Sequence, residues 1–312
     1  MRWWKPVRLI PDDTKYPFMR LSRFGFFLSG LLCAASIVLF STIGLNYGID
    51  FKGGTVMTIR TKGPAQLDML RSELNGLGLG TVELQQIGSP TDVKIRLESQ
   101  NDEKAEQVAQ EKVIKSLGSD VEIRSKETSG PTVSAEKTQQ ATGAVLLAIL
   151  FVLFYLRVRF EWQFAVGAVL SLLHDVTLTI GLFCLLRLDF SLSIIAAILT
   201  IIGYSLNDTV VVFDRIREYL RKYKSMALAD LIDFSINSVL PRTILTSLAT
   251  MMALLALYFF GGEVIRGFTF AMIWGVIVGT YSSIFIASPV LILLGTKRDL
   301  PAADTKSGFL KK

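Results

Sequence analysis

Six long apolar stretches constrain this chain more than any other feature of its sequence. They lie at 24–46, 138–156, 164–186, 192–213, 238–260 and 268–294. A helix needs roughly 20 apolar residues to cross the hydrocarbon core of a bilayer, and each stretch is close to that length. With 51% hydrophobic residues, 19% charged residues and a mean hydropathy of +0.46, the chain is also too apolar for a soluble domain of 312 residues. The sequence therefore predicts an α-helical polytopic membrane protein with six transmembrane helices.

The distribution of Lys and Arg predicts how these helices are oriented. Positive residues resist translocation, so short loops rich in them stay in the cytoplasm. On one side of the membrane, the short turns between spans contain only two positive residues, Arg187 and Arg266, whereas the opposite side contains many more. We therefore expect both termini in the cytoplasm, and we attribute the net charge of +6 to this bias and not to nucleic-acid binding. The basic residues of the opposite side are Arg2, Lys5, Arg8, Lys15, Arg20, Arg23, Arg157, Arg159, Arg215, Arg217, Arg221, Lys222, Lys224, Lys297 and Arg298.

This orientation divides the chain into five parts. A cytoplasmic segment at 1–23 precedes the first transmembrane helix at 24–46, and a cytoplasmic tail occupies 296–312. The remaining helices fall within 138–295. The polar segment at 47–137 is then a periplasmic domain, because long domains cross the membrane largely regardless of their charge.

Along this domain, the spacing of apolar residues alternates between that typical of strands and that typical of helices. The order is β-α-β-β-α-β, which matches the ferredoxin-like split βαβ motif, so we expect a small α+β ferredoxin-like domain. The predicted elements are a strand at 55–60, a helix ending near 76–80, two strands at 82–87 and 92–97 joined by a Gly-Ser-Pro-Thr turn, a helix at 102–117 and a strand at 120–126.

Four short stretches carry a family resemblance. The heptapeptide GIDFKGG at 48–54 follows the first span, and GYSLNDTVVVFDRIRE at 203–218 closes the fourth. Leu-His-Asp at 173–175 lies in the third span, and Arg-Thr with Thr-Ser at 242–247 lies in the fifth. In this order the set resembles SecF, the smaller subunit type of the SecD/SecF family of bacterial protein-export proteins, within the resistance-nodulation-division superfamily.

The resemblance implies a function as well as a fold. Family members are accessory subunits of the Sec protein translocase, which use the proton motive force together with a SecD partner to promote translocation across the bacterial inner membrane. The implied partners are a SecD-like subunit, the SecYEG translocon, YajC, the unfolded preprotein and protons, with no cofactor and no enzymatic activity. The family motif residues are Gly48, Asp50, Gly53, Gly54, Asp214 and Arg215.

Asp208 and Arg242 are the main candidates for a proton path. A charged side chain deep in a span is unfavourable by about 2.5 to 3.5 kcal/mol, so it usually faces protein or water and often serves transport. Both residues are expected at the same depth on consecutive helices, where they could form an ion pair that protonation of Asp208 would open. A purely structural ion pair is the alternative.

Further polar residues could contribute to this path. Asn207 and Thr209 flank Asp208, and Thr246 and Ser247 lie one turn beyond Arg242. Asp175 is a weaker candidate near mid-bilayer, and the neighbouring His174 fits hydrogen-bonded packing better than a proton relay.

Other motif residues have structural interpretations. Asp214 and Arg215 stand at the water boundary, where solvated charge is the default. Asp50, between glycines, is expected to accept hydrogen bonds from free backbone N–H groups. Gly203, Gly275 and Gly279 are expected to allow close helix contacts.

Two alternative functions compete with this interpretation. A half-transporter of a proton-driven drug or lipid exporter of the same superfamily fits the topology. An intramembrane protease does not, because neither the Gly-x-Gly-Asp nor the Gly-x-Ser-Gly signature is present. The chain has no P-loop sequence, and no His/Cys cluster suggests a metal site.

Overall fold

The computed structural model describes residues 11, 14–100, 102–118 and 121–296. The chain forms two compact units. Within the described residues, one is a helical bundle built from the N-terminal helix and from the segments 148–186 and 196–296. The other contains Leu45–Leu147 and Arg187–Ile195. The basic residues Arg2, Lys5, Arg8, Lys297 and Arg298, on which part of the expected orientation rests, lie outside the described residues.

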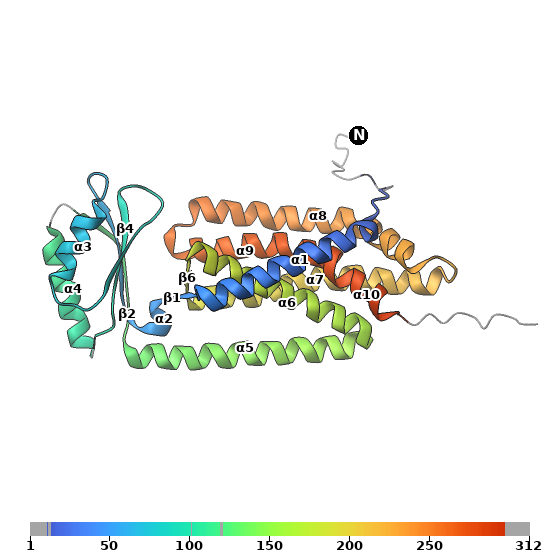
Figure 1. The fold of residues 1–312 in the computed structure, drawn as a ribbon, viewed down its shortest axis with the longest axis horizontal. Coiled ribbons are helices and arrows are strands. Elements are labelled where there is room, and N and C mark those ends of the chain that lie inside the picture. Colours follow the sequence, from blue (N-terminus) through green and yellow to red (C-terminus); the bar gives the residue numbers. More distant parts are fainter. Residues whose placement is uncertain (1–10, 12–13, 101, 119–120, 297–312) are drawn as a thin grey trace, which may run out of the picture. The chain divides into compact units, whose positions relative to one another are not determined.

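Six helical spans in the described residues are long and apolar enough to cross a membrane, which confirms the predicted membrane fold. The last span runs from Val264 to Leu294 and contains a π-helical turn, η2 (Ser283–Ala287), between α9 (Glu263–Ser282) and α10 (Ser288–Leu294). The other five, shown in Figure 1, are α1 (Phe18–Thr42), α5 (Pro131–Arg159), α6 (Trp162–Leu186), α7 (Leu192–Lys222) and α8 (Leu228–Phe260).

Several helices extend beyond the apolar stretches that predicted them. α7 continues to Lys222, although its apolar stretch ends at Phe213, and α8 begins at Leu228, ten residues before the stretch at 238–260. Hydropathy marks only the part of a helix that suits lipid, whereas backbone hydrogen bonding continues into water. Of the six spans, α6 and the last one are the most buried, so they lie at the centre of the bundle.

Glycines set two of the close helix contacts in this bundle. A Cβ atom on Gly275 of α9 would overlap the side chain of Ile201 on α7, and one on Gly279 would stand 3.0 Å from the Cβ of Ser205. Both positions therefore allow the approach expected of them. The expectation for Gly203 is wrong, because no atom lies within 4 Å of the position its Cβ would take. Sequence alone did not reveal which face of α7 meets a neighbour.

The second unit contains the predicted ferredoxin-like domain. Its strands are β2 (Gly54–Thr61), β3 (Val82–Gln86), β4 (Asp92–Leu97) and β5 (Val121–Ser129), paired antiparallel in the order β3-β4-β2-β5. In this order each βαβ unit has one strand of the other unit between its own two strands, as the split βαβ motif requires. Asp120, where the last strand was expected to begin, lies outside the described residues.

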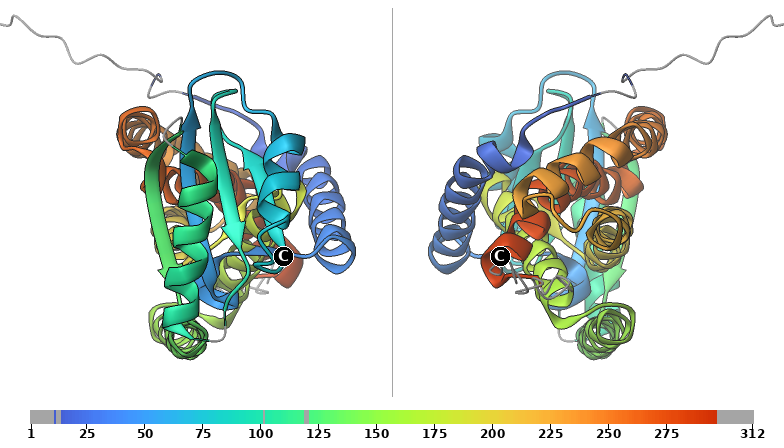
Figure 2. Two further views of the ribbon diagram at one scale, coloured as in Figure 1. Left: turned by 90° about the vertical axis from the view of Figure 1, so that its left-hand side faces the viewer. Right: turned by 90° about the vertical axis from the view of Figure 1, so that its right-hand side faces the viewer.

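Two helices cover one face of this sheet. They are α3 (Leu67–Asn75) and α4 (Glu103–Leu117), and Figure 2 shows them on the same side of the strands. Asp102 accepts a hydrogen bond from the backbone N–H of Ala105 at 2.6 Å and so caps α4. The core between helices and sheet consists of fully buried apolar side chains, among them Met57, Ile59, Leu74, Val93, Ile95 and Val113.

Candidate functional site

The GIDFKGG motif folds into a short helix, α2 (Ile49–Lys52), followed by two glycines. Gly53 has φ of 74° and Gly54 has φ of 106°, a backbone region that side chains with a Cβ rarely adopt. A Cβ on Gly54 would also collide with the carbonyl oxygen of Leu97. The two glycines therefore let the chain turn sharply from α2 into strand β2.

Asp50 in this motif connects three separate segments. Its Oδ2 accepts a hydrogen bond from the backbone N–H of Leu192, the first residue of α7, at 3.1 Å. Its Oδ1 pairs with Nζ of Lys137 on α5, also at 3.1 Å. Gly48 donates its N–H to the carbonyl oxygen of Phe190 at 2.8 Å. Asp50 therefore caps free backbone as expected, but the capped helix begins 142 residues later in the sequence.

A second carboxylate, which sequence reasoning missed, supports the same region. Asp189 lies in β6 (Asp189–Phe190), which pairs in parallel with β1 (Asn46–Tyr47). It accepts from Nζ of Lys94 at 2.7 Å and from a terminal guanidinium nitrogen of Arg96 at 2.8 Å. Asn46 donates to it at 2.8 Å. An acidic residue in a short turn between two spans was the signal available in the sequence.

Asp208 and Arg242 do not form the expected ion pair. Asp208 on α7 is 3% exposed, and its Oδ2 has no hydrogen-bond partner among the described residues. Arg242 on α8 is exposed and lies near enough for its charge to act on Asp208 without bonding to it. The sequence predicted that the two residues lie at a similar depth, but depth does not specify how α8 is rotated about its axis. In the structure, Arg242 is on an exposed face of α8.

Asp175 is more central than its ranking as a weaker candidate suggested. It is fully buried on α6, and its Oδ2 accepts hydrogen bonds from Ser205 of α7 at 2.6 Å and from Ser282 of α9 at 2.9 Å. Its Oδ1 lies 3.0 Å from Nδ1 of His174. Ser171 donates to Ser282 at 2.9 Å. Adjacent residues point about 100° apart on a helix, yet the carboxylate and the imidazole bend toward each other.

Of the other residues predicted for the path, only some face their neighbours. Thr209 and Ser283 are hydrogen-bonded at 3.1 Å, and Ser247 is bonded to Thr280 at 2.9 Å. Thr246 instead donates to the carbonyl oxygen of Thr243 in its own helix. Asn207 is exposed and makes no side-chain hydrogen bond within the described part of the chain. Neither Asn207 nor Thr246 is therefore hydrogen-bonded to Asp208 in the described part of the chain.

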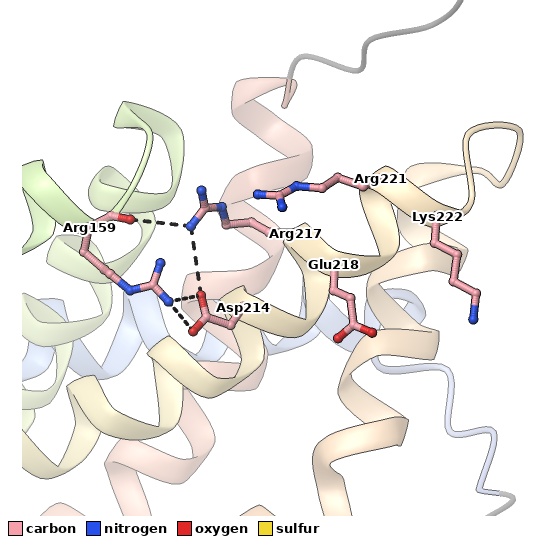
Figure 3. A pocket seen from close by; sticks show the side chains of 6 residues that line it. All are labelled: Arg159, Asp214, Arg217, Glu218, Arg221 and Lys222. Carbon is pink, nitrogen blue, oxygen red and sulfur yellow. Dashed lines mark hydrogen bonds and ion pairs between the residues drawn. The ribbon is translucent and has the colours of Figure 1, made fainter.

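The two charges at the end of the α7 motif lie in different surroundings. Arg159, at the end of α5, contacts both carboxylate oxygens of Asp214, as Figure 3 shows. Arg215 pairs with Glu218 one turn further along α7 at 2.7 Å. Arg215 is therefore a surface charge, as expected, whereas Asp214 forms an ion pair that joins α7 to α5.

Comparison with known proteins identifies the family. The model of the C-terminal region of the protein export membrane proteins SecD/SecF matches residues 109–297, and the SecD/SecF GG motif matches 38–65. A protein translocase subunit SecF from Rhodobacter capsulatus is 43% identical, with 97% of this chain and 96% of that protein covered. The chain belongs to the SecD/SecF family. The heptapeptide around Asp50 and the buried carboxylates of the bundle are therefore features of a SecD/SecF protein.

Further relatives place the chain within this family. SecF from Vibrio alginolyticus is 42% identical, with 96% of this chain and 97% of the relative covered. SecDF from Brucella abortus is 44% identical, with 96% of this chain but only 40% of the relative covered. The crystal structure of SecDF from Thermus thermophilus superposes with a TM-score of 0.82 at 36% identity, covering 93% of this chain and 40% of that one. The chain thus corresponds to the SecF part of the longer SecDF proteins.

Proposed function

We propose that this chain is the SecF-type accessory subunit of the Sec protein translocase in the bacterial inner membrane, with both termini in the cytoplasm. It acts with a SecD-like subunit and uses the proton motive force to promote translocation of unfolded preproteins delivered through SecYEG, with YajC as a further partner. Similarity to SecF proteins over nearly their whole length supports the subunit type. The SecDF relatives, of which this chain matches 40%, support a SecD partner that supplies the remaining part.

One observation carries the proton-driven part of this proposal: the carboxyl group of Asp208 is buried and incompletely bonded. An unpaired carboxylate is unfavourable in such surroundings, so uptake of a proton relieves the cost of its burial. Arg242, on the following helix α8, is the counter-charge that we propose for the ionised form. Protonation would change the charge of a buried group, and a proton gradient can drive such a change.

The arrangement suits transport without enzymatic chemistry. Asp208 lies on α7. The Asp175 carboxylate on α6 joins this helix to α9, because it accepts hydrogen bonds from the hydroxyls of Ser205 on α7 and Ser282 on α9. A change of charge at Asp208 therefore acts on a helix that shares hydrogen bonds with two others. We infer that such helix movement, and not bond cleavage, is the output of the bundle.

The test is proton flow coupled to export in inverted membrane vesicles that contain the chain and its SecD partner. Asp208→Asn keeps the size of the side chain but removes the titrating group, so both proton flow and completion of preprotein export should fall severalfold. Asp230→Asn is the matched control, since Asp230 is exposed in the first turn of α8. Normal proton flow and export in Asp208→Asn would overturn the proton-driven mechanism.

A further inference from the structure

A basic pocket lies where α5 ends beside the last turns of α7. It has a volume of about 520 Å³ and is shown in Figure 3. Neither the proton path nor the motif around Asp50 uses it. Its lining residues are Arg159, Asp214, Arg217, Glu218, Arg221 and Lys222.

Both acidic side chains of the pocket already have a partner. Asp214 is held through both oxygens by Arg159, and Glu218 is paired at 2.7 Å with Arg215, which does not line the pocket. Arg217 approaches Asp214 only to 4.0 Å. The guanidinium groups of Arg217 and Arg221 and the ammonium of Lys222 therefore leave an excess of positive charge at this pocket.

Arg217 and Arg221 present this excess together. They are four residues apart on α7, and Figure 3 shows their guanidinium groups on the same side of the helix. Like charges at this spacing repel each other. Arg217 is 4.0 Å from Asp214, and Arg221 has no ion pair within the described ranges, so the repulsion is offset only in part. An anion bound between the two guanidinium groups would offset it.

The surroundings of the pocket are those of a membrane surface. The apolar stretch of α7 ends at Phe213, directly before Asp214. The guanidinium groups of Arg159 and Arg217 lie 4.9 and 5.7 Å from the centre of the Phe160 ring. Trp162 starts α6 and is 58% exposed, and tryptophan is enriched at the headgroup level of membranes. The pocket therefore lies directly after the apolar part of α7, at the level where the headgroup of a lipid meets its acyl chains.

We propose that this pocket binds the phosphate group of an anionic phospholipid. Guanidinium groups bind phosphate oxygens through paired N–H donors, and arginine suits such sites better than lysine. Free inorganic phosphate has the same recognition chemistry, but it has no acyl chains to place beside the apolar part of α7 that ends at Phe213. The bound headgroup links the end of α5 to the end of α7 through Arg159, Arg217 and Arg221.

The test measures lipid retention by the full-length protein in non-ionic detergent, by native mass spectrometry. Dioleoyl phosphatidylglycerol is titrated against dioleoyl phosphatidylcholine, and the anionic lipid should be retained preferentially. Arg217→Gln and Arg221→Gln should each weaken its retention about fivefold, as expected when one cation near a membrane surface is removed. Arg221 is exposed and bonded to no acidic residue in the described segments, so Arg221→Gln should fold normally.

Lys224→Gln is the matched control, because Lys224 is exposed, lies two residues beyond Lys222 and does not line the pocket. It should retain the anionic lipid as the unaltered protein does. Equal losses in Lys224→Gln and Arg221→Gln would overturn the proposal in favour of a diffuse surface charge. Displacement of the lipid by millimolar inorganic phosphate would overturn the assignment to a lipid, and retention unchanged in both arginine variants would overturn the site altogether.

Discussion

The carboxylate of Asp50 accepts a hydrogen bond from the backbone N–H of Leu192, 142 residues later in the sequence. Leu192 is the first residue of α7, the continuous helix that also carries Asp208. The first N–H groups of a helix have no partner within it, so an acceptor there fixes where the helix begins. The motif after the first span therefore holds the start of the helix that bears the buried carboxylate.

Removing this acceptor should loosen the start of α7. Asp50→Ala leaves the Leu192 amide without its partner, and loss of a helix cap typically destabilises by about 1 kcal/mol. Amide hydrogen exchange in the first turn of α7 should then be roughly fivefold faster, as measured by mass spectrometry on the full-length protein. Asp50→Asn retains an oxygen acceptor and loses only the charge facing Lys137. Its exchange rate in the first turn of α7 should therefore lie between those of the unaltered protein and Asp50→Ala. Unchanged exchange in Asp50→Ala would show that the cap does not hold α7.

The Asp175 cluster predicts a difference between two substitutions of the same residue. Asp175→Leu leaves the Ser205 hydroxyl and the His174 ring without their acceptor, and each buried polar group left unpaired costs about 1–3 kcal/mol. Asp175→Asn retains an oxygen that can accept from Ser205 and Ser282. The unfolding temperature in detergent should therefore drop strongly in the leucine variant and slightly in the asparagine variant. Similar unfolding temperatures for both variants would contradict the hydrogen-bonded arrangement.

The Asp92 carboxylate predicts a pH dependence of the α+β domain. Arg60 donates to its two oxygens at 2.6 and 2.7 Å, and these hydrogen bonds hold the pKa of Asp92 below its usual value of 3.8. A group whose pKa is lower in the folded state stabilises above the unfolded pKa, and this contribution is lost as the pH falls through the folded pKa. Stability should therefore decline as the pH falls below about 4.

Hydrogen exchange of β2 and β4 in the full-length chain, compared at pH 6 and pH 3 after correction for intrinsic rates, measures this decline. Asp92→Asn should be less stable by about 1 kcal/mol at pH 6 and should show a smaller change with pH. Asp68→Asn is the control, because the Asp68 side chain is fully exposed in α3. A pH response as large in Asp92→Asn as in the unaltered chain would assign the effect to other carboxyl groups.

Two glycines of the bundle should respond in opposite ways to alanine. Gly275→Ala places a methyl group against the stiff side chain of Ile201 and should destabilise by about 1–3 kcal/mol. Gly203→Ala meets no atom within 4 Å and should be neutral or slightly stabilising, because alanine favours the helix. Unfolding temperatures in detergent measure both. A loss in Gly203→Ala as large as in Gly275→Ala would mean that helix contact is not the cause.

Much of the architecture could be predicted from local properties of the sequence. Bilayer thickness sets the length of an apolar stretch, and the alternation of side chains distinguishes strands from helices, so the six spans and the split βαβ order followed directly. The candidate site was predicted only in part. Asp208 is buried as expected, but Arg242 does not bond to it, and Asp175 has more partners than its place in the sequence suggested.

By itself, then, the sequence determined which segments suit lipid, which fold as the polar domain, and that ionisable groups would lie inside the bundle. Only the tertiary structure decided which of these groups meet. Ser205 and Ser282 are 30 and 107 residues from Asp175, and Leu192 is 142 residues from Asp50. Contacts at such separations depend on how each helix is rotated about its axis and packed against its neighbours, and hydropathy along the chain does not specify that rotation.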